Sequence, residues 1–244
     1  MLENYKEKYK HEGKFIFVPN YECIRKGLRI VEFCRDRLEF PDCFYHYRNG
    51  GHVAALHRHL DNRFFFRIDL QNFYYAISRN RVCAALHASG FHKARTYGKW
   101  SCVRNPVAED PRYSLPIGFV QSPALASLVL MRSPIMGAIS AAERDSVFIS
   151  VYLDDLIGSS TDFSLLERAY YTILEACGAA NLQVNARKLL PPASEIHAFN
   201  CVLKHGLAEV TDERIRKFVA SEPSDLAEKA FIAYCLRVQE RNFA

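Results

Sequence analysis

The chain has 244 residues, of which 49% are hydrophobic and 24% are charged, and its formal net charge is +5. This length and apolar content suffice to bury a sizeable core, and they favour one continuous catalytic unit over two independent domains. The positive charge permits nucleic-acid binding without demonstrating it. No apolar stretch reaches the roughly 18 residues that span a bilayer, and the N-terminus is charged and unlike a signal sequence, so no membrane partner is expected.

The eight cysteines are scattered along the chain without a Cys-x-x-Cys pair. This pattern predicts neither a zinc ribbon nor a disulfide framework, and it fits a protein of the reducing cytoplasm.

Basic residues gather in two stretches that also contain Tyr, Phe and Trp side chains. Single-stranded nucleic acids favour this mixture of positive charge and stacking surface, and the alternative is an ordinary solvated basic face. The first stretch contains Arg25, Lys26, Arg29, Arg35, Arg37 and Arg48, and the second contains Lys93, Arg95, Lys99 and Arg104.

Three histidines lie in the stretch from Gly50 to His59. No Cys or acid is spaced to complete a tetrahedral zinc site with them. The stretch therefore predicts a short basic helix that follows a glycine turn and faces either nucleic acid or the main sheet.

An aromatic and β-branched run from Arg63 to Leu70 predicts a strand that ends in the carboxylate of Asp69. A helix is expected from about Ser78 to Ser89, with Gly90 just beyond its end. A longer apolar helix begins at Ser122, where serine and the following proline form a typical helix start, and Pro134 bends or ends it.

Two adjacent acids, Asp154 and Asp155, interrupt the apolar stretch from Val147 to Ile157, which otherwise predicts a buried β-hairpin. Burying charged groups costs several kcal/mol unless they are paired or coordinated, so a divalent-cation site is indicated. The alternative is ordinary turn chemistry, because Asp tolerates turns. If the strand ending in Asp69 lies beside this hairpin, the three acids form one two-metal site.

Further elements are expected after the hairpin. They are a helix from about Phe163 to Cys177 closed by Gly178, strands near Leu182–Asn185 and Ile196–Leu203, and helices at Thr211–Ala220 and Ser224–Glu240.

Several motifs, in this order, resemble those of the reverse transcriptase family. Asp69 followed five residues later by Tyr74 resembles its first catalytic motif. Leu115–Pro123 is similar to its Leu-Pro-Gln-Gly…Ser-Pro motif, and Tyr152–Asp155 to its Tyr-x-Asp-Asp box. Leu182–Lys188 is similar to its Leu-x-x-Asn-x-x-Lys segment, and Phe199–Leu203 to the short strand that follows that segment.

The resemblance implies an α+β fold: a right-hand polymerase palm with a split β-α-β antiparallel sheet, short fingers and a minimal or truncated helical thumb. The implied regions are fingers at 1–62, the palm at 63–206 with a fingers insertion at about 91–114, and a thumb-like tail at 207–244. The implied activity is RNA-directed DNA polymerase, in which deoxynucleotides are transferred to a 3′-hydroxyl. The implied cofactor is a pair of Mg²⁺ ions, with Mn²⁺ as an alternative.

The same resemblance assigns roles to individual residues. Asp69, Asp154 and Asp155, with the carbonyl of Leu70, would bind the metal ions. Lys188 would neutralise or protonate the leaving pyrophosphate, although alone it is typical of a solvated charge. The substrate residues would be Tyr74, which excludes a 2′-hydroxyl, Gly118, where the nucleotide approaches the backbone, Gln121, and Arg48 and Arg63 as candidates for the triphosphate.

Ile117 stands where most members from retroviruses, group II introns and retrons carry Gln, and this variant is similar to that of bacterial abortive-infection and other defence-associated members. The chain as a whole most resembles bacterial defence-associated, abortive-infection or retron-like members. Expected partners are an RNA template, with a dedicated non-coding RNA as one candidate, the DNA product and deoxynucleoside triphosphates. The small thumb suggests self-association or a partner protein through the apolar stripe of the last helix, and the alternative is that the stripe packs on the palm. The stripe contains Leu226, Ala230, Ile232, Ala233 and Leu236.

Two other functions stay open. One is an untemplated or protein-primed DNA polymerase on the same palm, favoured by the short fingers and by Ile117. The other is a non-catalytic RNA-binding scaffold, against which three costly acids argue.

Overall fold

The structure is a computed structural model that describes residues 4–243. The chain forms two compact units, each assembled from separated segments. Unit 1 comprises residues 4–41, 70–136 and 177–183, and unit 2 comprises residues 42–69, 137–176 and 184–243.

Unit 2 is built on a four-stranded antiparallel sheet with the order β6-β7-β3-β8. A three-stranded antiparallel sheet with the order β11-β10-β9 follows it in the chain. The strands are β3 (Phe64–Asp69), β6 (Phe148–Tyr152), β7 (Asp155–Ser160), β8 (Leu190–Ala193), β9 (Glu195–Ala198), β10 (Cys201–Lys204) and β11 (Leu207–Val210).

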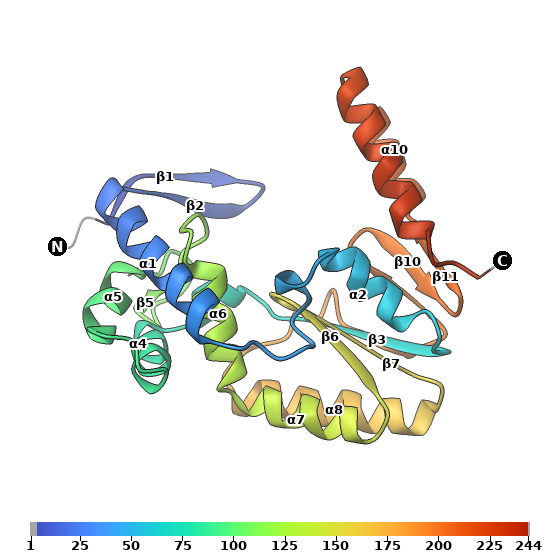
Figure 1. The fold of residues 1–244 in the computed structure, drawn as a ribbon, viewed down its shortest axis with the longest axis horizontal. Coiled ribbons are helices and arrows are strands. Elements are labelled where there is room, and N and C mark those ends of the chain that lie inside the picture. Colours follow the sequence, from blue (N-terminus) through green and yellow to red (C-terminus); the bar gives the residue numbers. More distant parts are fainter. Residues whose placement is uncertain (1–3, 244) are drawn as a thin grey trace. The chain divides into compact units, whose positions relative to one another are not determined.

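Helices cover both faces of the four-stranded sheet. In Figure 1, α7 and α8 lie along one face and α2 along the other. The helices with most or all of their residues in this unit are α2 (Gly51–His59), α7 (Pro134–Arg144), α8 (Phe163–Ala179), α9 (Asp212–Val219) and α10 (Asp225–Gln239), and a 3-10 turn spans Tyr45–Tyr47.

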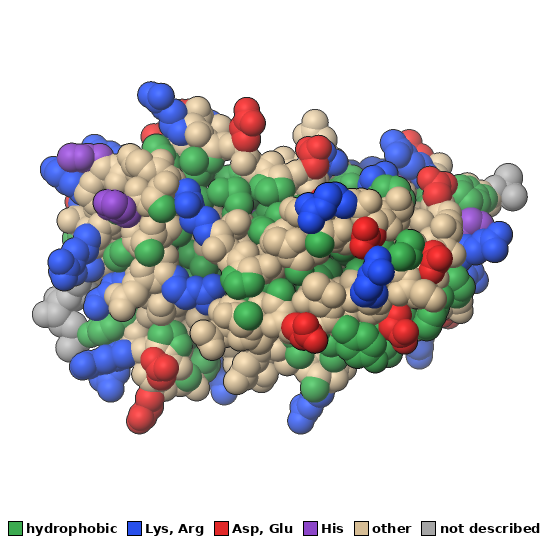
Figure 2. All heavy atoms as spheres, turned by 90° about the horizontal axis from the view of Figure 1, so that it is seen from below, with side chains coloured by type: hydrophobic (Ala, Val, Ile, Leu, Met, Phe, Trp, Pro, Cys, Tyr) green, Lys and Arg blue, Asp and Glu red, His purple; other side chains and the backbone are tan. Residues whose placement is uncertain are grey.

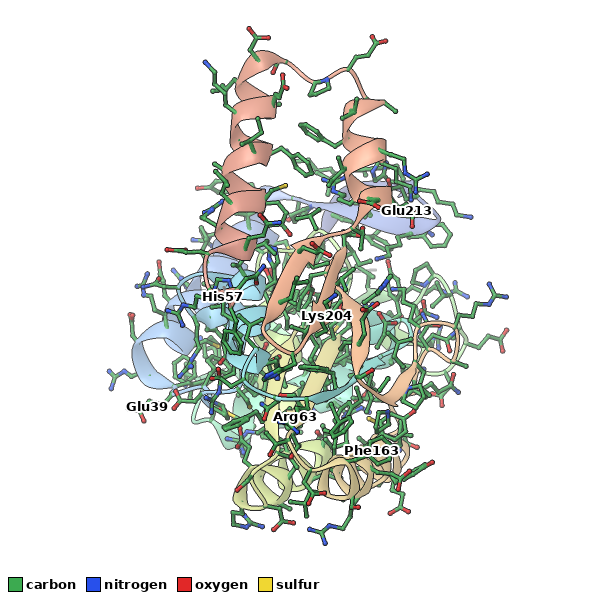
Figure 3. All side chains as sticks on the ribbon, turned by 90° about the vertical axis from the view of Figure 1, so that its right-hand side faces the viewer. Glu39, His57, Arg63, Phe163, Lys204 and Glu213 are labelled. Atoms are coloured by element: carbon green, nitrogen blue, oxygen red, sulfur yellow. The ribbon has the colours of Figure 1, made fainter. Side chains whose placement is uncertain are left out.

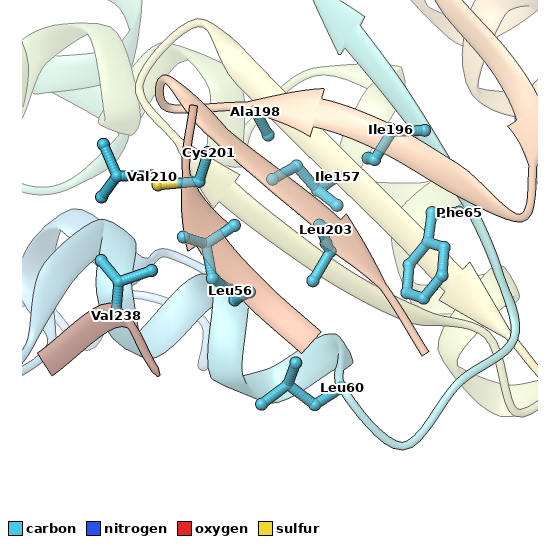
Figure 4. Packing of buried hydrophobic residues seen from close by; sticks show 11 residues of the cluster. Leu56, Leu60, Phe65, Ile157, Ile196, Ala198, Cys201, Leu203, Val210 and Val238 are labelled. Atoms are coloured by element: carbon cyan, nitrogen blue, oxygen red, sulfur yellow. The ribbon is translucent and has the colours of Figure 1, made fainter. Parts of the chain in front are cut away.

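The alternation of side chains along β3 explains this layering, because successive residues of a strand point to opposite faces. Phe64 and Phe66 contact aromatic rings of α8, with centroid distances of 5.3 Å to Phe163 and 5.4 Å to Tyr170. Phe65 faces the other way, into the core cluster shown in Figure 4. Arg67 and Asp69 share the face of Phe65, so the face covered by α2 carries the acid.

The core cluster of unit 2 joins both sheets to α2 and α10 (Figure 4). Its members are 0 to 7% exposed, so burial of this apolar surface is the main force that holds these elements together. They are Leu56, Leu60, Phe65, Ile157, Ile196, Ala198, Cys201, Leu203, Ala208, Val210 and Val238.

Helices α9 and α10 stand side by side at the end of unit 2 (Figure 3). The rings of Phe218 and Phe231 stack between them with centroids 4.0 Å apart. The predicted apolar stripe is largely exposed, with Leu226, Ile232 and Leu236 at 79, 52 and 63%. A different face of α10 packs on the core, so packing of this stripe on the palm was the wrong alternative, and its role in an interaction stays a prediction.

Unit 1 contains a hairpin of two strands, a second short antiparallel pair and most of the remaining helices. Its core cluster contains Phe17, Cys23, Tyr75, Val103 and Phe119. Its elements are β1 (Tyr5–His11), β2 (Lys14–Pro19), α1 (Tyr21–Arg37), α3 (Phe73–Ala76), α4 (Arg79–Ala88), α5 (Ala94–Trp100), β4 (Val103–Arg104), β5 (Tyr113–Ser114) and α6 (Ser122–Met131).

Most predicted helices are confirmed, and so are the local signals behind them. The side chains of Ser78, Thr211 and Ser224 each accept a hydrogen bond from a backbone N–H in the first turn of the helix that follows. The helix that begins at Ser122 ends before Pro134, which opens the next helix. Among residues 4–243 no single helix is both long and apolar enough to span a bilayer, although α6 and α7 taken together would meet that test.

Three expectations about secondary structure were wrong. The expected strand near Leu182–Asn185 is mostly irregular, and the next strand in the chain is β8, which pairs with β3 on the side opposite β7. The expected strand Ile196–Leu203 is a hairpin, because Phe199 and Asn200 adopt positive φ angles of 54° and 61° and turn the chain between β9 and β10. Helix α8 continues through Gly178 to Ala179.

The three histidines of α2 have separate hydrogen-bond partners. His59 is fully buried, and its two ring nitrogens lie 2.6 Å from Ser159 Oγ and 2.8 Å from Ser150 Oγ. These serines lie on β7 and β6, so the histidine ties α2 to the hairpin that carries the paired acids. Burial lowers the pKa of His59 to about 3.

We expect acid to weaken unit 2 through His59. The unfolded chain binds a proton near pH 6.5 and the folded chain does not, so this stability is present above pH 6.5 and is lost as pH falls below it. The expected loss between pH 6.5 and pH 5 is about 2 kcal/mol in the free energy of unfolding. Urea unfolding at both pH values measures it. His59→Gln should lose the part of the pH dependence that His59 supplies, whereas the exposed control His92→Gln should keep it; the part supplied by half-buried His46 stays in both variants. Equal behaviour of the two variants would contradict the assignment.

Candidate active site

Two acids meet at one end of the four-stranded sheet. Asp69 is the last residue of β3 and Asp155 is the first residue of β7, and the antiparallel register pairs them directly. Directly opposed residues place their side chains on the same face of a sheet. The register therefore brings two carboxylates, far apart in the sequence, to one point on the face covered by α2.

Arg67 binds both acids. Its Nε and Nη2 donate hydrogen bonds to Asp155 Oδ1 at 2.8 and 2.6 Å, and Nη2 lies 3.8 Å from Asp69 Oδ2. The side chains of Arg67, Asp155 and Asp69 are 16, 16 and 3% exposed. One guanidinium group thus compensates two largely buried charges.

Lys188 supplies a second cation. Its Nζ donates a hydrogen bond to Asp69 Oδ2 at 2.9 Å. The segment that carries it is also held by the backbone, because the N–H of Asn185 donates to the carbonyl of Asp69 at 2.8 Å. The lysine side chain is 52% exposed, so it reaches the acid from the solvent side.

Burial and charge oppose each other at Asp155. Burial raises the pKa of the Asp155 carboxyl above its ordinary value, and the attraction of Arg67 acts against this rise. Asp69 raises the pKa further, because a like charge close by disfavours ionisation. An added cation would relieve both effects.

Asp154 lies in the two-residue turn between β6 and β7, next to Asp155. The residue before it, Leu153, has a positive φ of 57°, which is uncommon for a residue with a side chain. The backbone N–H of Leu153 donates to His46 Nδ1 at 3.4 Å. Burial lowers the pKa of His46 to about 4, which keeps the ring neutral and able to accept this bond.

Aromatic rings hold the residue that opens this turn. Tyr152 contacts His46, His52 and Phe199, with ring centroids 5.9, 5.9 and 5.5 Å apart. These rings come from three separate segments of unit 2, and together they fix the end of β6.

The acids fit a divalent cation in chemistry and in placement. Carboxylate oxygens are the ligands that Mg²⁺ prefers, and a positively charged group already lies between two of them. As they stand, no three His, Cys, Asp or Glu side chains within residues 4–243 lie close enough to hold a metal ion. Arg67 and Lys188 donate hydrogen bonds to Asp155 Oδ1 and Asp69 Oδ2, which are oxygens that a metal ion would take.

The two arginines predicted for the triphosphate have other surroundings. Arg63 precedes β3, at the opposite end of the strand from Asp69 (labelled in Figure 3), so the structure does not bring it to the acids. Arg48 pairs with Asp42 at 2.5 Å and lies over the ring of Tyr45.

The predicted nucleotide-binding residues Leu70, Tyr74, Gly118 and Gln121 all belong to unit 1. Leu70 is buried, and Tyr74 is half-buried in the single turn of α3. Gln121 is fully buried, and its Nε2 donates to Ser101 Oγ at 3.3 Å. The side chain of Gln121 is therefore packed inside unit 1, and its contact with substrate stays a prediction.

Gly118 is required by its own unit. It has a φ of +108°, and a Cβ atom there would lie 2.2 Å from the carbonyl oxygen of Phe17. Phe17 in turn donates its N–H to the carbonyl of Ile117 at 2.9 Å. The backbone of β2, within the same unit, thus approaches the glycine closely. Glycine is therefore required at this position even without a bound nucleotide.

We therefore expect Gly118→Ala to lower the free energy of unfolding by about 2 kcal/mol or more, through strain and steric overlap. Gly137→Ala is the matched control, because Gly137 lies in α7 with no atom within 4 Å of an added Cβ. That control should be neutral or more stable by about 0.5–1 kcal/mol. Chemical denaturation of both variants measures the difference, and equal stability would contradict the close approach.

The sequence did not single out Arg67, and a signal for it was present. Arg67 stands two residues before Asp69 in a predicted strand, and residues two apart share a face. The strands of the N-terminal hairpin were also missed, although Glu12 and Gly13 form a turn between alternating residues.

An antiparallel sheet that brings acids from two adjacent strands together with cations is suited to metal-dependent phosphoryl transfer. The family model described as "Reverse transcriptase (RNA-dependent DNA polymerase)" matches residues 24–191. The chain belongs to the reverse transcriptase family, whose members are RNA-directed DNA polymerases.

A solved structure of a reverse transcriptase has a similar fold. A foamy viral protease-reverse transcriptase in complex with double-stranded DNA matches with a TM-score of 0.50 and 18% identity, over 84% of this chain and 30% of that chain. The foamy viral protease-reverse transcriptase in complex with an RNA/DNA hybrid has a TM-score of 0.49 and 16% identity, over 84% and 23%. The chain thus spans less than a third of the length of these proteins. No curated protein sequence matches the chain.

Proposed function

We propose that the chain is an RNA-directed DNA polymerase that transfers deoxynucleotides to a 3′-hydroxyl at the site of Asp69, Asp154 and Asp155. The observation that supports this most is the direct pairing of Asp69 with Asp155, next to the turn that carries Asp154. Membership of the reverse transcriptase family supports the same reaction.

The acids would hold two Mg²⁺ ions, or Mn²⁺, together with the carbonyl of Leu70. When bound, the ions supply charge stabilisation for the attacking hydroxyl and for the leaving pyrophosphate. Arg67 keeps Asp155 oriented by two hydrogen bonds before substrate binds. Lys188 is exposed on its solvent side, so its ammonium group can turn from Asp69 toward the pyrophosphate and neutralise it or give it a proton.

Tyr74 is the proposed sugar gate, because a bulky ring beneath the incoming sugar leaves no room for a 2′-hydroxyl. We expect Tyr74→Ala to raise ribonucleotide incorporation, relative to deoxynucleotide incorporation, by about 10-fold or more. Single-nucleotide extension with each sugar measures the ratio, and Phe is the conservative variant that should keep it. An unchanged ratio in Tyr74→Ala would remove Tyr74 as the gate.

The test of the polymerase uses the whole chain, purified from a bacterial host with its bound RNA. Mg²⁺ and four labelled deoxynucleotides are supplied, beside an Asp154→Ala control, and the product is sequenced. Product complementary to a bound RNA supports the proposal and identifies the template, which a dedicated non-coding RNA could supply. A homopolymer or simple repeat unrelated to any bound RNA would favour an untemplated or protein-primed polymerase, for which Ile117 at the usual Gln position argues.

We further propose a role in bacterial defence against phage, on the resemblance of the Pro-Ile-Gly segment at 116–118 to defence-associated members. Plaque counts on bacteria that express the wild-type chain or Asp154→Ala test this role. Protection that requires Asp154 supports it, and equal plaque counts with both chains contradict it.

A further inference from the structure

A wide groove on unit 1 is not used by the proposed reaction. Two adjoining hollows of about 850 and 630 Å³ share the loop from Gly90 to Lys93. Helices α4 and α5 line the first hollow, and the second half of α1 lines the second. The two hollows together form one continuous surface, here called the α4–α5 groove.

The charge of the α4–α5 groove is entirely positive. Its lining contains no Asp or Glu, and two histidines, His87 and His92, add to the basic residues. Figure 2 shows Lys, Arg and His side chains gathered at the left of that view, where Figure 1 draws α4 and α5. The Lys and Arg residues of the groove are Arg29, Arg37, Arg79, Lys93, Arg95 and Lys99.

These cations differ from the others on α1 in having no acidic partner. Arg25 and Lys26 pair with Glu22, and Arg35 pairs with Asp36. Within the part of the chain that the structure describes, none of the six groove cations forms an ion pair. Like charges gathered in a concave surface repel each other, and they attract a polyanion strongly.

Aromatic rings form part of the groove as well. Phe91 packs edge-to-face against Phe33 and against Tyr97, with ring centroids 4.9 Å apart in both pairs. All three rings are half-buried, so they are held in place yet keep some surface in the groove. Arg29 donates a hydrogen bond to the hydroxyl of Tyr97 at 3.2 Å, which joins the charged and aromatic parts.

The groove also has fixed walls. The Cβ of a residue larger than glycine at position 98 would lie 2.4 Å from Cys83 Sγ, so Gly98 lets α5 pack closely on α4. Lys93, the residue just before α5, has a positive φ of 58°, and Gly90 has a φ of 77° in the loop. The basic and aromatic side chains are therefore presented on packed helices and on a turn of defined geometry.

We propose that the α4–α5 groove binds single-stranded nucleic acid, with its cations on the phosphates and its rings against unpaired bases. A small anion has no bases that could stack on the rings. A duplex keeps its bases stacked inside, where the rings cannot contact them. This binding goes beyond the polymerase reaction, because it requires no metal and none of the three acids.

The test measures binding of a fluorescein-labelled single-stranded RNA of about 20 nucleotides to the full chain in EDTA, by anisotropy over a range of salt. The groove variant is Arg95→Glu with Lys99→Glu. The matched control is Arg144→Glu with Arg241→Glu, which changes the net charge equally at two exposed arginines outside the groove.

We expect the groove variant to bind at least about tenfold more weakly near 0.1 M salt, and its salt slope to fall by about 1.4 for two lost phosphate contacts. The control should stay within about threefold of wild type with an unchanged slope. Phe91→Leu should weaken single-strand binding about fivefold and leave duplex binding unchanged.

Parallel titrations with single-stranded DNA, with a duplex and with poly-glutamate identify the ligand. Tight binding of single-stranded RNA or DNA supports the proposal, and the nucleic acid that binds more tightly is identified as the ligand. Equal losses in the groove and control variants would overturn it, as would preference for the duplex. Poly-glutamate binding as tight as RNA would overturn it in favour of an acidic protein partner. The groove variant should lose binding of single strands and keep polymerase activity on a short RNA/DNA hybrid. This result would show that the groove acts separately from the carboxylate site.

Discussion

Replacement of Asp69 by Asn is expected to abolish deoxynucleotide incorporation, with a loss of at least about 10³-fold in rate. The change keeps the size of the side chain and removes the charge that pairs with Lys188 and lies beside Arg67. The acid is 3% exposed, so no water-filled space lets another group replace it. Primer extension on an RNA template, at saturating Mg²⁺ and nucleotide, measures the loss.

The matched control for this substitution is Asp61→Asn, which removes the same charge at an exposed position just before β3. It should keep full activity. The two proteins should also show the same folded secondary structure by circular dichroism. Synthesis by Asp69→Asn at even a tenth of the wild-type rate would contradict the assignment of Asp69 to the reacting centre.

The second large effect is expected on stability, from Arg67→Ala. This change leaves Asp155 and Asp69, which are 16 and 3% exposed, without their shared cation. Removal of one partner from a buried ion pair costs about 3–5 kcal/mol, because the remaining charge stays out of water. Urea unfolding without Mg²⁺ should show a loss of this size. Millimolar Mg²⁺ should restore part of it, because an ion that binds only the folded chain stabilises that chain.

Arg63→Ala is the control, since it truncates an arginine of the same segment at the exposed end of β3. It should change the free energy of unfolding by no more than about 0.5 kcal/mol and should show no added response to Mg²⁺. Arg67→Lys should keep part of the stability, because it retains the charge without the two parallel hydrogen bonds. If Arg67→Ala is as stable as Arg63→Ala, the guanidinium does not hold the acids. If Mg²⁺ fails to stabilise Arg67→Ala, the acids do not bind the ion.

Helices with a strong local signal were predictable from the sequence. Ser78, Thr211 and Ser224 cap the helices that follow them, and Pro134 separates two others. The hairpin around Asp154 was predictable for the same reason, because two apolar runs flank a polar pair. In each case the residues that decide the element are neighbours in the chain.

The strands after Lys188 were less predictable. The segment Ile196–Leu203 has the composition of one strand, yet the turn at Phe199 and Asn200 divides it so that β9 and β10 pair with each other. Ile196 and Leu203 both belong to the buried core cluster of unit 2 (Figure 4). Burial of both ends outweighs the strained turn, and no pattern within the eight residues reveals that balance.

Residue types and motif order alone were sufficient to place this chain in the reverse transcriptase family and to select Asp69, Asp154 and Asp155 as candidate acids. Tertiary structure decided what surrounds them. Arg67 meets Asp155 only through the register of β3 and β7, and Gln121 becomes buried only when α6 packs inside unit 1. The physical reason is that the order of motifs is a property of the sequence itself. Charge compensation and burial depend instead on which distant segments pack together in the folded core.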